Sequence, residues 1–465
     1  MRRLSTAAAV VFVLFVYAFF GSIGELAFPR VYWDQGFGKP ADGYYASLAE
    51  GFLRGQVSMA HRPDPRLTAL PHPYDYEARV ANKVPYLWDA SYFNGRYYLY
   101  FSPLPALLLY IPYRLAATMY PGDQFAGTLF AAWAFIMAVL FVRRALAGTT
   151  LHVPLPIWII TLGLSGVTPF VLPHCRTYEV AILCGAAMTS TWAYALLRFL
   201  QTRATRWLVW SSIWLALAVA SRPHLGVLVP LFLVAVFVSA GKRAVLATVP
   251  LAIVVAALLA YNYTRFHDPF EFGLRYQLTY MPMEGHRVCG IHNVPELRRA
   301  VHNFALYTFT PPRLSREFPF VRLRSAPLNV ATSFTPQSDE IGGLAPLAPL
   351  AFIGSLFAIV LAWRRRERAA VLAVAAGWLV LLGLCTCWYV SARYALDFWF
   401  LISAGAIVAL ERGSAAIASR PLRIAAIAVA LISSLAGALL GFQATSGAFE
   451  YFNPELFHRL SRLFE

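Results

Sequence analysis

Residues 223–240 read PHLGVLVPLFLVAVFVSA and contain no Asp, Glu, Lys or Arg, and residues 243–263 are nearly as apolar. A helix needs about 20 predominantly apolar residues to cross the roughly 30 Å hydrocarbon core of a bilayer. Only Gly241 and Lys242 separate the two runs. The stretch therefore predicts two consecutive membrane-spanning helices.

The same pattern recurs along the whole chain. Apolar residues make up 59% of the sequence and charged residues 13%, and the mean hydropathy is +0.56, whereas a soluble domain has about 25% charged residues. The first run is too long for a secretory signal peptide and has no small-residue cleavage site before Phe28. The predicted spans are 4–28, 124–146, 153–172, 176–200, 207–221, 223–240, 243–263, 343–363, 368–388, 393–411 and 421–441.

The net charge of +16 comes from basic residues at the ends of the spans, on alternate connections. Lys and Arg concentrate on the cytoplasmic side of membrane proteins, so these connections are predicted to be cytoplasmic and no nucleic-acid partner is expected. The clusters are Arg2-Arg3, Arg143-Arg144, Arg198/Arg203/Arg206, Lys242-Arg243, Arg364-Arg365-Arg366/Arg368 and Arg412/Arg420/Arg423.

The apolar stretch 103–119 is predicted to lie at the membrane surface. If it crossed the membrane, every later basic cluster would change sides while the N-terminal arginines stayed in place. It also contains Pro103, Pro105, Pro112 and Arg114, which suit an interfacial helix better than a crossing one. The sequence thus predicts an all-α polytopic membrane protein of about eleven transmembrane helices, with its N-terminus inside and its C-terminus outside.

This topology leaves two long segments on the outer face, 29–123 and 264–342. Both are too long for simple connections, and loops of this length usually carry function. We expect a catalytic membrane module over 1–263, which includes the first outer segment. The second outer segment, 264–342, follows, and 343–465 forms the last transmembrane helices and an outer tail.

The cysteines do not form an obvious disulfide framework. Cys184, Cys385 and Cys387 lie in predicted spans, which leaves Cys175 and Cys289 as the outward pair whose bonding stays open. No G-x-x-x-x-G-K-[ST] loop for nucleotide phosphates is present.

Asp42 is the first candidate for chemistry, because carboxylates are few in this chain and this one precedes a short amphipathic helix rich in aromatic residues. The segment 42–55 is predicted to lie at the interface with Asp42 at the helix N-terminus. The alternative interpretation is an N-cap, a common role for aspartate, and the two roles are compatible.

A second outward cluster spans 88–106. Asn94-Gly95 indicates a two-residue turn between two short aromatic stretches. An aromatic belt at the membrane surface would explain the tyrosines, but not Asp89 and Arg96 among them.

Charged residues also stand at the outer ends of three spans. Charges at membrane depth usually face a cavity or a partner, so Glu179 and Asp397 are each expected to pair with an arginine, by packing between helices or in a ligand site. The three segments are Arg176-Thr177-Tyr178-Glu179, Ser221-Arg222-Pro223-His224 and Arg393-Tyr394-Ala395-Leu396-Asp397.

Taken in order, these segments resemble the GT-C class of integral-membrane glycosyltransferases, over most of the chain. Protein O-mannosyltransferases and aminoarabinose transferases are the better-understood relatives, and residues 261–273 resemble a segment of uncharacterised bacterial members. The resemblance implies juxtamembrane helices in the first outer loop. The segments are Asp42-Gly43-Tyr44-Tyr45, 97–106, Tyr178-Glu179, Ser221-Arg222-Pro223 and Arg393-Tyr394-x-x-Asp397.

Two departures from those relatives point to a different donor or acceptor. Gly43 follows Asp42 where the relatives usually have an Asp-Glu pair. Ser102-Pro103-Leu104-Pro105 stands in place of their Lys/His-Pro-Pro motif.

The resemblance implies an inverting transfer of a sugar from a polyprenyl-phosphate donor. Asp42 would act as the base toward an acceptor hydroxyl. An arginine would stabilise the leaving phosphate, with Arg222, Arg275 and Arg96 as candidates in that order. The other candidate substrate-binding residues are Asp89, Tyr97, Tyr98, Arg176, Tyr178, Glu179, Arg393 and Asp397.

No cofactor is expected. Asp75 and Glu77 could bind Mg²⁺ or Mn²⁺ through their oxygens, but an exposed polar loop is the preferred interpretation. The competing functions are a lipid or glycan flippase without chemistry and a ligase or polymerase of lipid-linked glycans. The partners are then the lipid donor, membrane lipids and a glycan, lipid or protein acceptor. The Arg- and Ala-rich composition suggests a bacterial inner membrane, with the active face toward the periplasm or cell wall.

Overall fold

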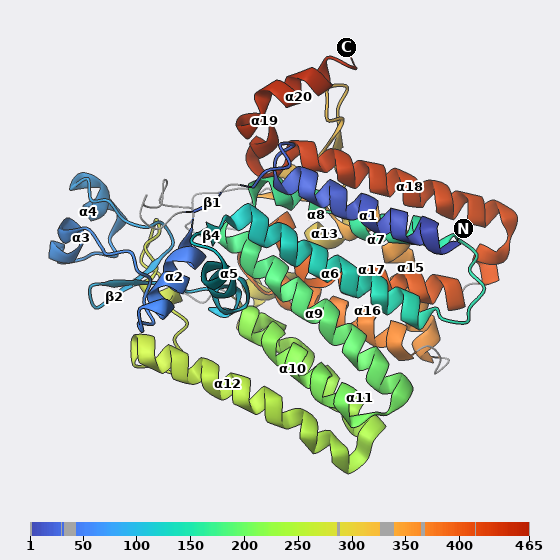
Figure 1. Ribbon diagram of the computed structural model, residues 1–465, viewed down its shortest axis with the longest axis horizontal. Helices are drawn as coiled ribbons and strands as arrows, with labels where there is room; N and C mark the ends of the chain where they lie inside the picture. Colours follow the sequence, from blue (N-terminus) through green and yellow to red (C-terminus); the bar gives the residue numbers. More distant parts are fainter. Residues whose placement is uncertain are drawn as a thin grey trace.

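The structure is a computed structural model that describes residues 2–28, 30–31, 43–285, 289–325, 339–363, 368–413 and 415–464. Long helices run side by side and form one bundle (Figure 1). They are α1 (Arg2–Gly21), α6 (Asp123–Ala145), α7 (Leu155–Leu164), α9 (Thr177–Thr202), α10 (Thr205–Ser221), α11 (Leu228–Ala240), α12 (Val245–Phe266), α15 (Pro349–Trp363), α16 (Arg368–Cys385), α17 (Leu396–Gly413) and α18 (Arg420–Gln443). Short helices α8 (Thr168–Val171) and α14 (Leu344–Leu347) lie between them.

Eight segments of the described chain are long and apolar enough to cross a membrane. The chain is therefore an integral membrane protein of mainly helical fold. The eight segments omit α10 and α15, which are shorter, and count α11 and α12 together as Pro223–Phe266. Each predicted span contains a helix of the bundle, but the number of eleven crossings stays a prediction. Helix α1 ends at Gly21, well before the predicted end at residue 28.

Two helices form the centre of the bundle. In α9 and α17, 94% of the most apolar window is buried, against 17% in Pro223–Phe266. Helices α11 and α12 therefore lie at the edge and expose apolar side chains, as lipid-facing helices do. Glycine permits the closest contacts: a Cβ added at Gly437 of α18 would lie 1.8 Å from the carbonyl oxygen of Leu164 at the end of α7. Small residues at such crossings let membrane helices pack closely.

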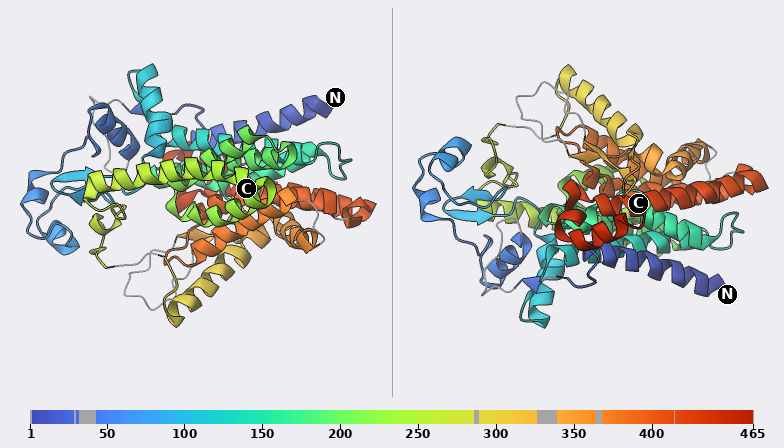
Figure 2. Two further views of the ribbon diagram at one scale, coloured as in Figure 1. Left: turned by 90° about the horizontal axis from the view of Figure 1, so that it is seen from below. Right: turned by 90° about the horizontal axis from the view of Figure 1, so that it is seen from above.

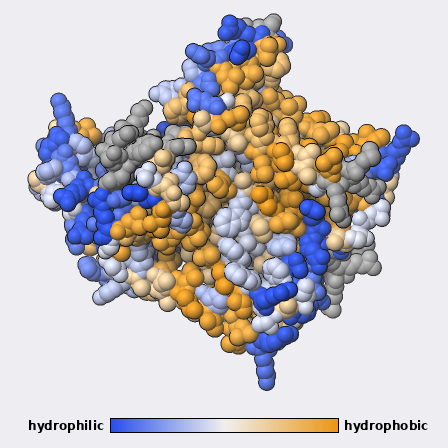
Figure 3. All heavy atoms as spheres, viewed as in Figure 1, coloured by the Kyte–Doolittle hydropathy of each residue, from blue (hydrophilic) through white to orange (hydrophobic). Residues whose placement is uncertain are grey.

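The predicted basic connections meet at one end of the bundle, which we call the basic end. Arg144 in the last turn of α6 donates to Gln201 of α9 (2.7 Å), and Arg203 donates to the carbonyl of Ser239 in α11 (3.0 Å). Glu411 near the end of α17 accepts the backbone N–H of Val153 at 3.0 Å. Figure 3 shows hydrophilic residues at the two ends and a mostly apolar surface between them. These contacts agree with the predicted alternation of the connections.

The opposite end, which we call the loop end, carries both long connections. The first contains α2 (Tyr44–Leu53), α3 (Pro65–Ala69), α4 (Tyr76–Ala81), a hairpin of β2 (Ser91–Phe93) and β3 (Arg96–Tyr98), and α5 (Ile111–Ala116). The second contains α13 (Val294–Phe309), and the C-terminal segment contains α19 (Ala448–Phe452) and α20 (Pro454–Ser461). Two-residue strands pair as β1 (Arg30–Val31) with β4 (Tyr120–Pro121), β5 (Arg313–Leu314) with β6 (Val321–Arg322), and β7 (Arg324–Ser325) with β8 (Glu340–Ile341).

The hairpin has the predicted turn. Asn94 and Gly95 both have positive φ, at 48° and 72°, as a two-residue turn that matches the strand twist requires. Its register pairs Ser91 with Tyr98, Tyr92 with Tyr97 and Phe93 with Arg96.

The stretch predicted to stay at the surface forms a short helix. A π-helical turn, Ala106–Tyr110, continues into α5 and ends at Ala116. Eleven residues of helix, from 106 to 116, rise about 16 Å, roughly half the hydrocarbon thickness. The helix stands across the direction of the long helices, end-on in Figure 1 and upright in Figure 2.

The disulfide differs from the sequence-based interpretation. Cys289 bonds to Cys387, whereas Cys175 is buried and free. Helix α16 ends at Cys385, so Cys387 lies beyond it at the loop end and not inside a span. Backbone pairing of Cys289 with Cys387 brings the second outer segment to this point. A disulfide is typical of a compartment outside the cytosol, and the outward side of this end stays a prediction.

We predict that Thr118 and Thr150, two exposed threonines beyond α5 and α6, lie on opposite sides of the membrane. With Thr118→Cys, a membrane-impermeant maleimide should label intact spheroplasts. With Thr150→Cys, labelling should require lysis. The native cysteines give little background, because three are buried and two are bonded. Labelling of Thr118→Cys only after lysis, together with labelling of Thr150→Cys in intact spheroplasts, would contradict the surface position of α5.

We also predict that reduction lowers the melting temperature of the purified protein. The bond closes a loop across 98 residues, and such a crosslink stabilises by up to about 4.7 kcal/mol through the unfolded chain. Cys289→Ser with Cys387→Ser should melt at the lower temperature with or without reductant, whereas Cys175→Ser should respond to reductant as the wild type does. An unchanged melting temperature on full reduction would show that the bond does not stabilise the fold.

Candidate active site at the loop end

Three helix starts or junctions converge at the loop end. Helix α9 begins at Thr177, and the backbone N–H of Arg176 donates to the Glu179 carboxylate at 2.9 Å, which caps the helix. Residues 222–227 turn the chain from α10 into α11, and residues 392–395 form the turn before α17. Because each connection is short, its polar side chains are held close to the helix ends. The first outer segment lies over them.

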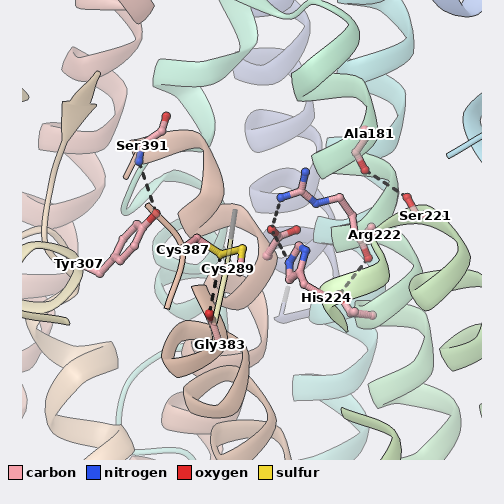
Figure 4. Close-up of polar contacts among 12 residues, drawn as sticks. Ala181, Ser221, Arg222, His224, Cys289, Tyr307, Gly383, Cys387 and Ser391 are labelled. Carbon is pink, nitrogen blue, oxygen red and sulfur yellow. Dashed lines mark hydrogen bonds and ion pairs between the residues drawn. A yellow bond between two sulfur atoms is a disulfide. The ribbon is translucent and has the colours of Figure 1, made fainter. Parts of the chain in front are cut away.

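Arg222 and Asp397 form a buried ion pair. The Arg222 Nη2 lies 2.9 Å from the Asp397 Oδ2, and the two side chains are 10% and 0% exposed. His224 Nε2 lies 3.1 Å from the same oxygen, so one carboxylate receives two groups from the α10–α11 junction (Figure 4). The pairing joins residues 175 positions apart in the chain.

Arg393 and Glu179 form the second buried pair. The Arg393 Nη1 lies 2.9 Å from the Glu179 Oε1, and the Arg393 Nη2 lies 3.6 Å from Asp339 of the second outer segment. The guanidinium also lies 5.1 Å from the ring centroid of Tyr178. The expected pairing of each membrane-depth carboxylate with an arginine is thus present.

Tyr394 connects the two pairs. Its ring centroid is 5.4 Å from the Arg222 guanidinium and 5.6 Å from that of Arg393. An aromatic face attracts both cations. The two arginines, from different connections, therefore flank one ring.

Asp89 joins the first outer segment to this cluster. It accepts a hydrogen bond from the Tyr178 hydroxyl, and its backbone N–H donates to the carbonyl of Leu278 at 3.0 Å. Burial raises the pKa of the Asp89 carboxyl above its usual value near 3.8, although the Tyr178 hydrogen bond and the charge of Arg393 act in the other direction. Asp89 has φ of 60°, a left-handed conformation that aspartate tolerates. We call Asp89, Tyr178, Glu179, Arg222, His224, Asp339, Arg393, Tyr394 and Asp397 the loop-end cluster.

Helix α2 covers the cluster from the first outer segment. The Tyr44 hydroxyl donates to the carbonyl of Trp88 at 2.7 Å, next to Asp89, and Tyr45 stacks on Tyr110 with ring centroids 5.6 Å apart. The N-cap of α2 is Gly43, with φ of 86° and no side-chain cap. The cap thus falls at Gly43, one residue after Asp42. Asp42 itself lies outside the described residues, so both of its expected roles stay predictions.

The other predicted phosphate-binding arginines lie apart from the buried pairs. Arg275 is exposed and pairs with Glu284 on the surface, where an ion pair contributes little. Arg96 is exposed at the end of the hairpin, opposite Phe93. Of the predicted set, Arg222 alone has a place in the loop-end cluster.

Tyr97 and Tyr98 help to pack the first outer segment. Tyr97 is buried, and its hydroxyl accepts the backbone N–H of Leu87 at 3.4 Å. Tyr98 is buried against Phe266, with ring centroids 5.3 Å apart. These contacts explain their burial, and their role in substrate binding stays a prediction.

Asp75, one of the two residues weighed as metal ligands, caps a helix. Asp75 is the N-cap of α4, where its carboxylate accepts the backbone N–H groups of Glu77 (3.0 Å) and Ala78 (3.4 Å). Within the described ranges, no cluster of three His, Cys, Asp or Glu side chains could hold a metal ion.

Several buried polar residues were missed from the sequence. Asp123, the first residue of α6, is 5% exposed and accepts the hydroxyls of Tyr110 (2.5 Å) and Thr177 (3.3 Å). An acidic residue at the start of a span was the available signal, as at Glu179. His224 and Asp339 were also missed, because only the fold shows their partners.

Arg265 near the end of α12 is another buried arginine at this end. It is 2% exposed and donates to the carbonyl of Leu99 (2.7 Å) and the Asn262 amide oxygen (2.6 Å). The ring of Tyr261 lies 4.1 Å from its guanidinium. These contacts fasten the lipid-facing α12 to the first outer segment.

No protein-family model matches the chain, and no curated protein matches its sequence. Solved structures do align with it, including the following two. An oligosaccharyltransferase from Archaeoglobus fulgidus in the apo form aligns with a TM-score of 0.42 and 14% identity, over 94% of this chain and 56% of that chain. The archaeal oligosaccharyltransferase AglB from the same organism, in complex with an inhibitory peptide and a dolichol-phosphate, aligns with a TM-score of 0.44 and 12% identity, over 99% of this chain and 59% of that chain. The chain thus spans less than two thirds of either structure.

We predict that Arg222→Gln and Asp397→Asn each lower stability strongly, whereas the double variant is more stable than either. Each single change leaves one buried charge without its partner, which typically lowers the free energy of unfolding by about 3–5 kcal/mol. The loss should be similar for the two single variants. Thermal unfolding in detergent measures the effect.

Arg66→Gln is the matched control, since the Arg66 side chain is 57% exposed in its pair with Asp64 and should change the melting temperature little. Single variants at Arg222 and Asp397 that melt like the control would show that the pair does not hold the loop end together.

Proposed function

We propose that the protein is a membrane glycosyltransferase that moves a sugar from a polyprenyl-phosphate donor to an acceptor hydroxyl on the outer face of the membrane. The observation that supports this proposal most is the loop-end cluster. It gathers two arginines, a histidine and four carboxylates next to α2, the helix that follows Asp42 in the sequence. Arginine donors for a phosphate and a carboxylate for the acceptor hydroxyl are the two parts that this reaction needs.

The arginines keep donors for an anionic ligand. A guanidinium has five N–H donors. The Nε atoms of Arg222 and Arg393 are buried and have no hydrogen-bond partner within the described residues. Arginine recognises phosphate with a planar pair of donors, and it stays charged in a water-poor site. We assign the donor phosphate to the region of Arg222 and the shared Tyr394 ring.

The chemical step is an inverting displacement. A carboxylate takes the proton of the acceptor hydroxyl while that oxygen attacks the anomeric carbon. The bond from the anomeric carbon to the phosphate oxygen breaks, and polyprenyl phosphate leaves with the electron pair. Arginine stabilises the charge that develops on the leaving oxygen. Asp42 is the proposed base, since it stands two residues before Tyr44, which is anchored beside Asp89.

Asp89 is the second candidate for the base. Its raised pKa makes it a stronger base than a surface carboxylate, but its hydrogen bond from Tyr178 occupies one oxygen. We therefore assign to Asp89 the role of positioning either the acceptor or the first outer segment. Tyr178, Glu179 and Arg393 support Asp89 in this role. The disulfide supports an oxidising compartment on this side, such as a bacterial periplasm.

We predict that Asp42→Asn slows release of polyprenyl phosphate by about 10²–10⁴-fold, the usual effect of losing a general base. The assay uses purified protein, a polyprenyl-phosphate sugar and an acceptor extract. Asp75→Asn is the matched control: it is an aspartate of the same outer segment that caps α4 and should retain turnover.

Near-normal turnover in Asp42→Asn would move the role of base to Asp89. A wild-type protein that releases no polyprenyl phosphate, but moves the intact lipid across the bilayer, would identify a flippase. Products that carry whole glycan chains would identify a ligase or polymerase.

A further inference from the structure

The two outer segments meet in a backbone pairing beside Asp89. The N–H of Asp89 donates to the carbonyl of Leu278, and the N–H of Leu278 donates to the carbonyl of Ala90, both at 3.0 Å. Ser91 and Gln277 continue the pairing. This junction brings together aromatic residues that lie far apart in the sequence.

Four aromatic rings gather at this junction, and we call them the aromatic cluster: Tyr76, Tyr86, Trp88 and Tyr280. The ring centroids of Trp88 and Tyr280 are 4.4 Å apart, and those of Tyr76 and Tyr280 are 5.4 Å apart. Tyr280 is 47% exposed, and the other three are partly exposed. The cluster thus exposes aromatic surface at the position next to Asp89.

A buried arginine holds the cluster in place. Arg79 is 0% exposed and donates to the carbonyls of Pro73 (2.6 Å) and Thr279. Its guanidinium lies 4.5 Å from the ring centroid of Tyr86 and 5.9 Å from that of Tyr76. The arginine thereby connects α4, the first outer segment and the residue before Tyr280. Rings fixed in this way lose little freedom when a ligand binds.

The cluster does not lie where an aromatic belt would lie. Belts stand at the level of the lipid headgroups. Helix α4, which carries Tyr76, projects beyond the loop end, farther from the bundle than α2 or α5 (Figures 1 and 2). Glu77, next to Tyr76, and Asp75 are exposed. The rings therefore lie near two exposed carboxylates on a part of the first outer segment that projects from the bundle.

We propose that the aromatic cluster binds a sugar unit of the acceptor, so that the acceptor is a glycan. This inference rests on the proposed function. The C–H face of a pyranose is apolar and packs on the negative face of an aromatic ring, while the sugar hydroxyls bond to nearby carboxylates. Trp88 is bonded to Asp89, and consecutive Cα atoms are about 3.8 Å apart. A sugar on Trp88 and Tyr280 presents the next unit of the chain to the loop-end cluster.

A peptide acceptor fits this surface less well. Extended peptides commonly bind by adding a strand to a free edge. At this junction the backbone groups of Asp89, Ala90 and Leu278 already bond to each other, and the carbonyl of Tyr97 in β3 accepts the N–H of Met59 at 2.9 Å. The junction presents rings to a ligand, and its paired backbone is occupied.

Binding of fluorescent oligosaccharides tests the inference without the lipid donor. The probes are linear mannan, glucan, arabinan and galactan fragments, with an unglycosylated Ser/Thr-rich peptide as the alternative ligand. Wild-type protein should bind at least one saccharide series, and Tyr280→Ala should weaken that binding about tenfold, the loss of one ring contact. Tyr280→Phe keeps the ring and should bind as the wild type does.

Tyr451→Ala is the matched control, because Tyr451 of α19 is 72% exposed and lies outside the cluster. Equal saccharide binding by Tyr280→Ala and wild type, no saccharide binding at all, or binding of the peptide alone would overturn the inference. So would a Tyr280→Ala variant that loses retention on lipid vesicles and keeps saccharide binding. Saccharide binding without release of polyprenyl phosphate would leave the subsite standing and overturn the transferase proposal instead.

Discussion

Charged groups among membrane helices must be paired, because an isolated ion at that depth costs several kcal/mol. The loop end of this protein meets that constraint with two arginine–carboxylate pairs. Arg222 with Asp397 and Arg393 with Glu179 connect α9, the α10–α11 junction and the start of α17. Because the pairs join helices from distant parts of the chain, they fix the positions on which the outer segments rest.

The same ion pairs also bear on ligand binding at the site. A buried pair alone is weak evidence for stability, since apolar residues of similar volume often stabilise as well. The Nε atoms of Arg222 and Arg393 are buried and have no hydrogen-bond partner among the described residues. Under the proposed function, a phosphate would compete with the Asp397 and Glu179 carboxylates for the guanidinium donors. Structure and proposed chemistry thus depend on the same side chains.

The sequence predicted the helices well, but it did not predict most of the residue pairs that connect the helices and the outer segments. The length of an apolar run and the residues of a tight turn are local properties. The helices and the Asn94-Gly95 turn could therefore be predicted from the sequence. Pairing partners are not local: the bond of Cys289 to Cys387 depends on where α16 ends. For the same reason, the junction of Asp89 with Leu278 could not be predicted from the sequence. The surface pair of Arg275 with Glu284, which places a predicted phosphate ligand outside the loop-end cluster, could not be predicted either.

The central claim is that a lipid phosphate binds at the loop-end cluster. A polyprenyl phosphate with a photoreactive diazirine on the first isoprene unit tests it most directly, in lipid nanodiscs, with crosslinked peptides identified by mass spectrometry. We expect crosslinks in 176–180, 221–228 and 389–397, and their loss when unlabelled polyprenyl phosphate competes. Crosslinks confined to the lipid-facing residues of α11 and α12, with no effect of the competitor, would contradict it.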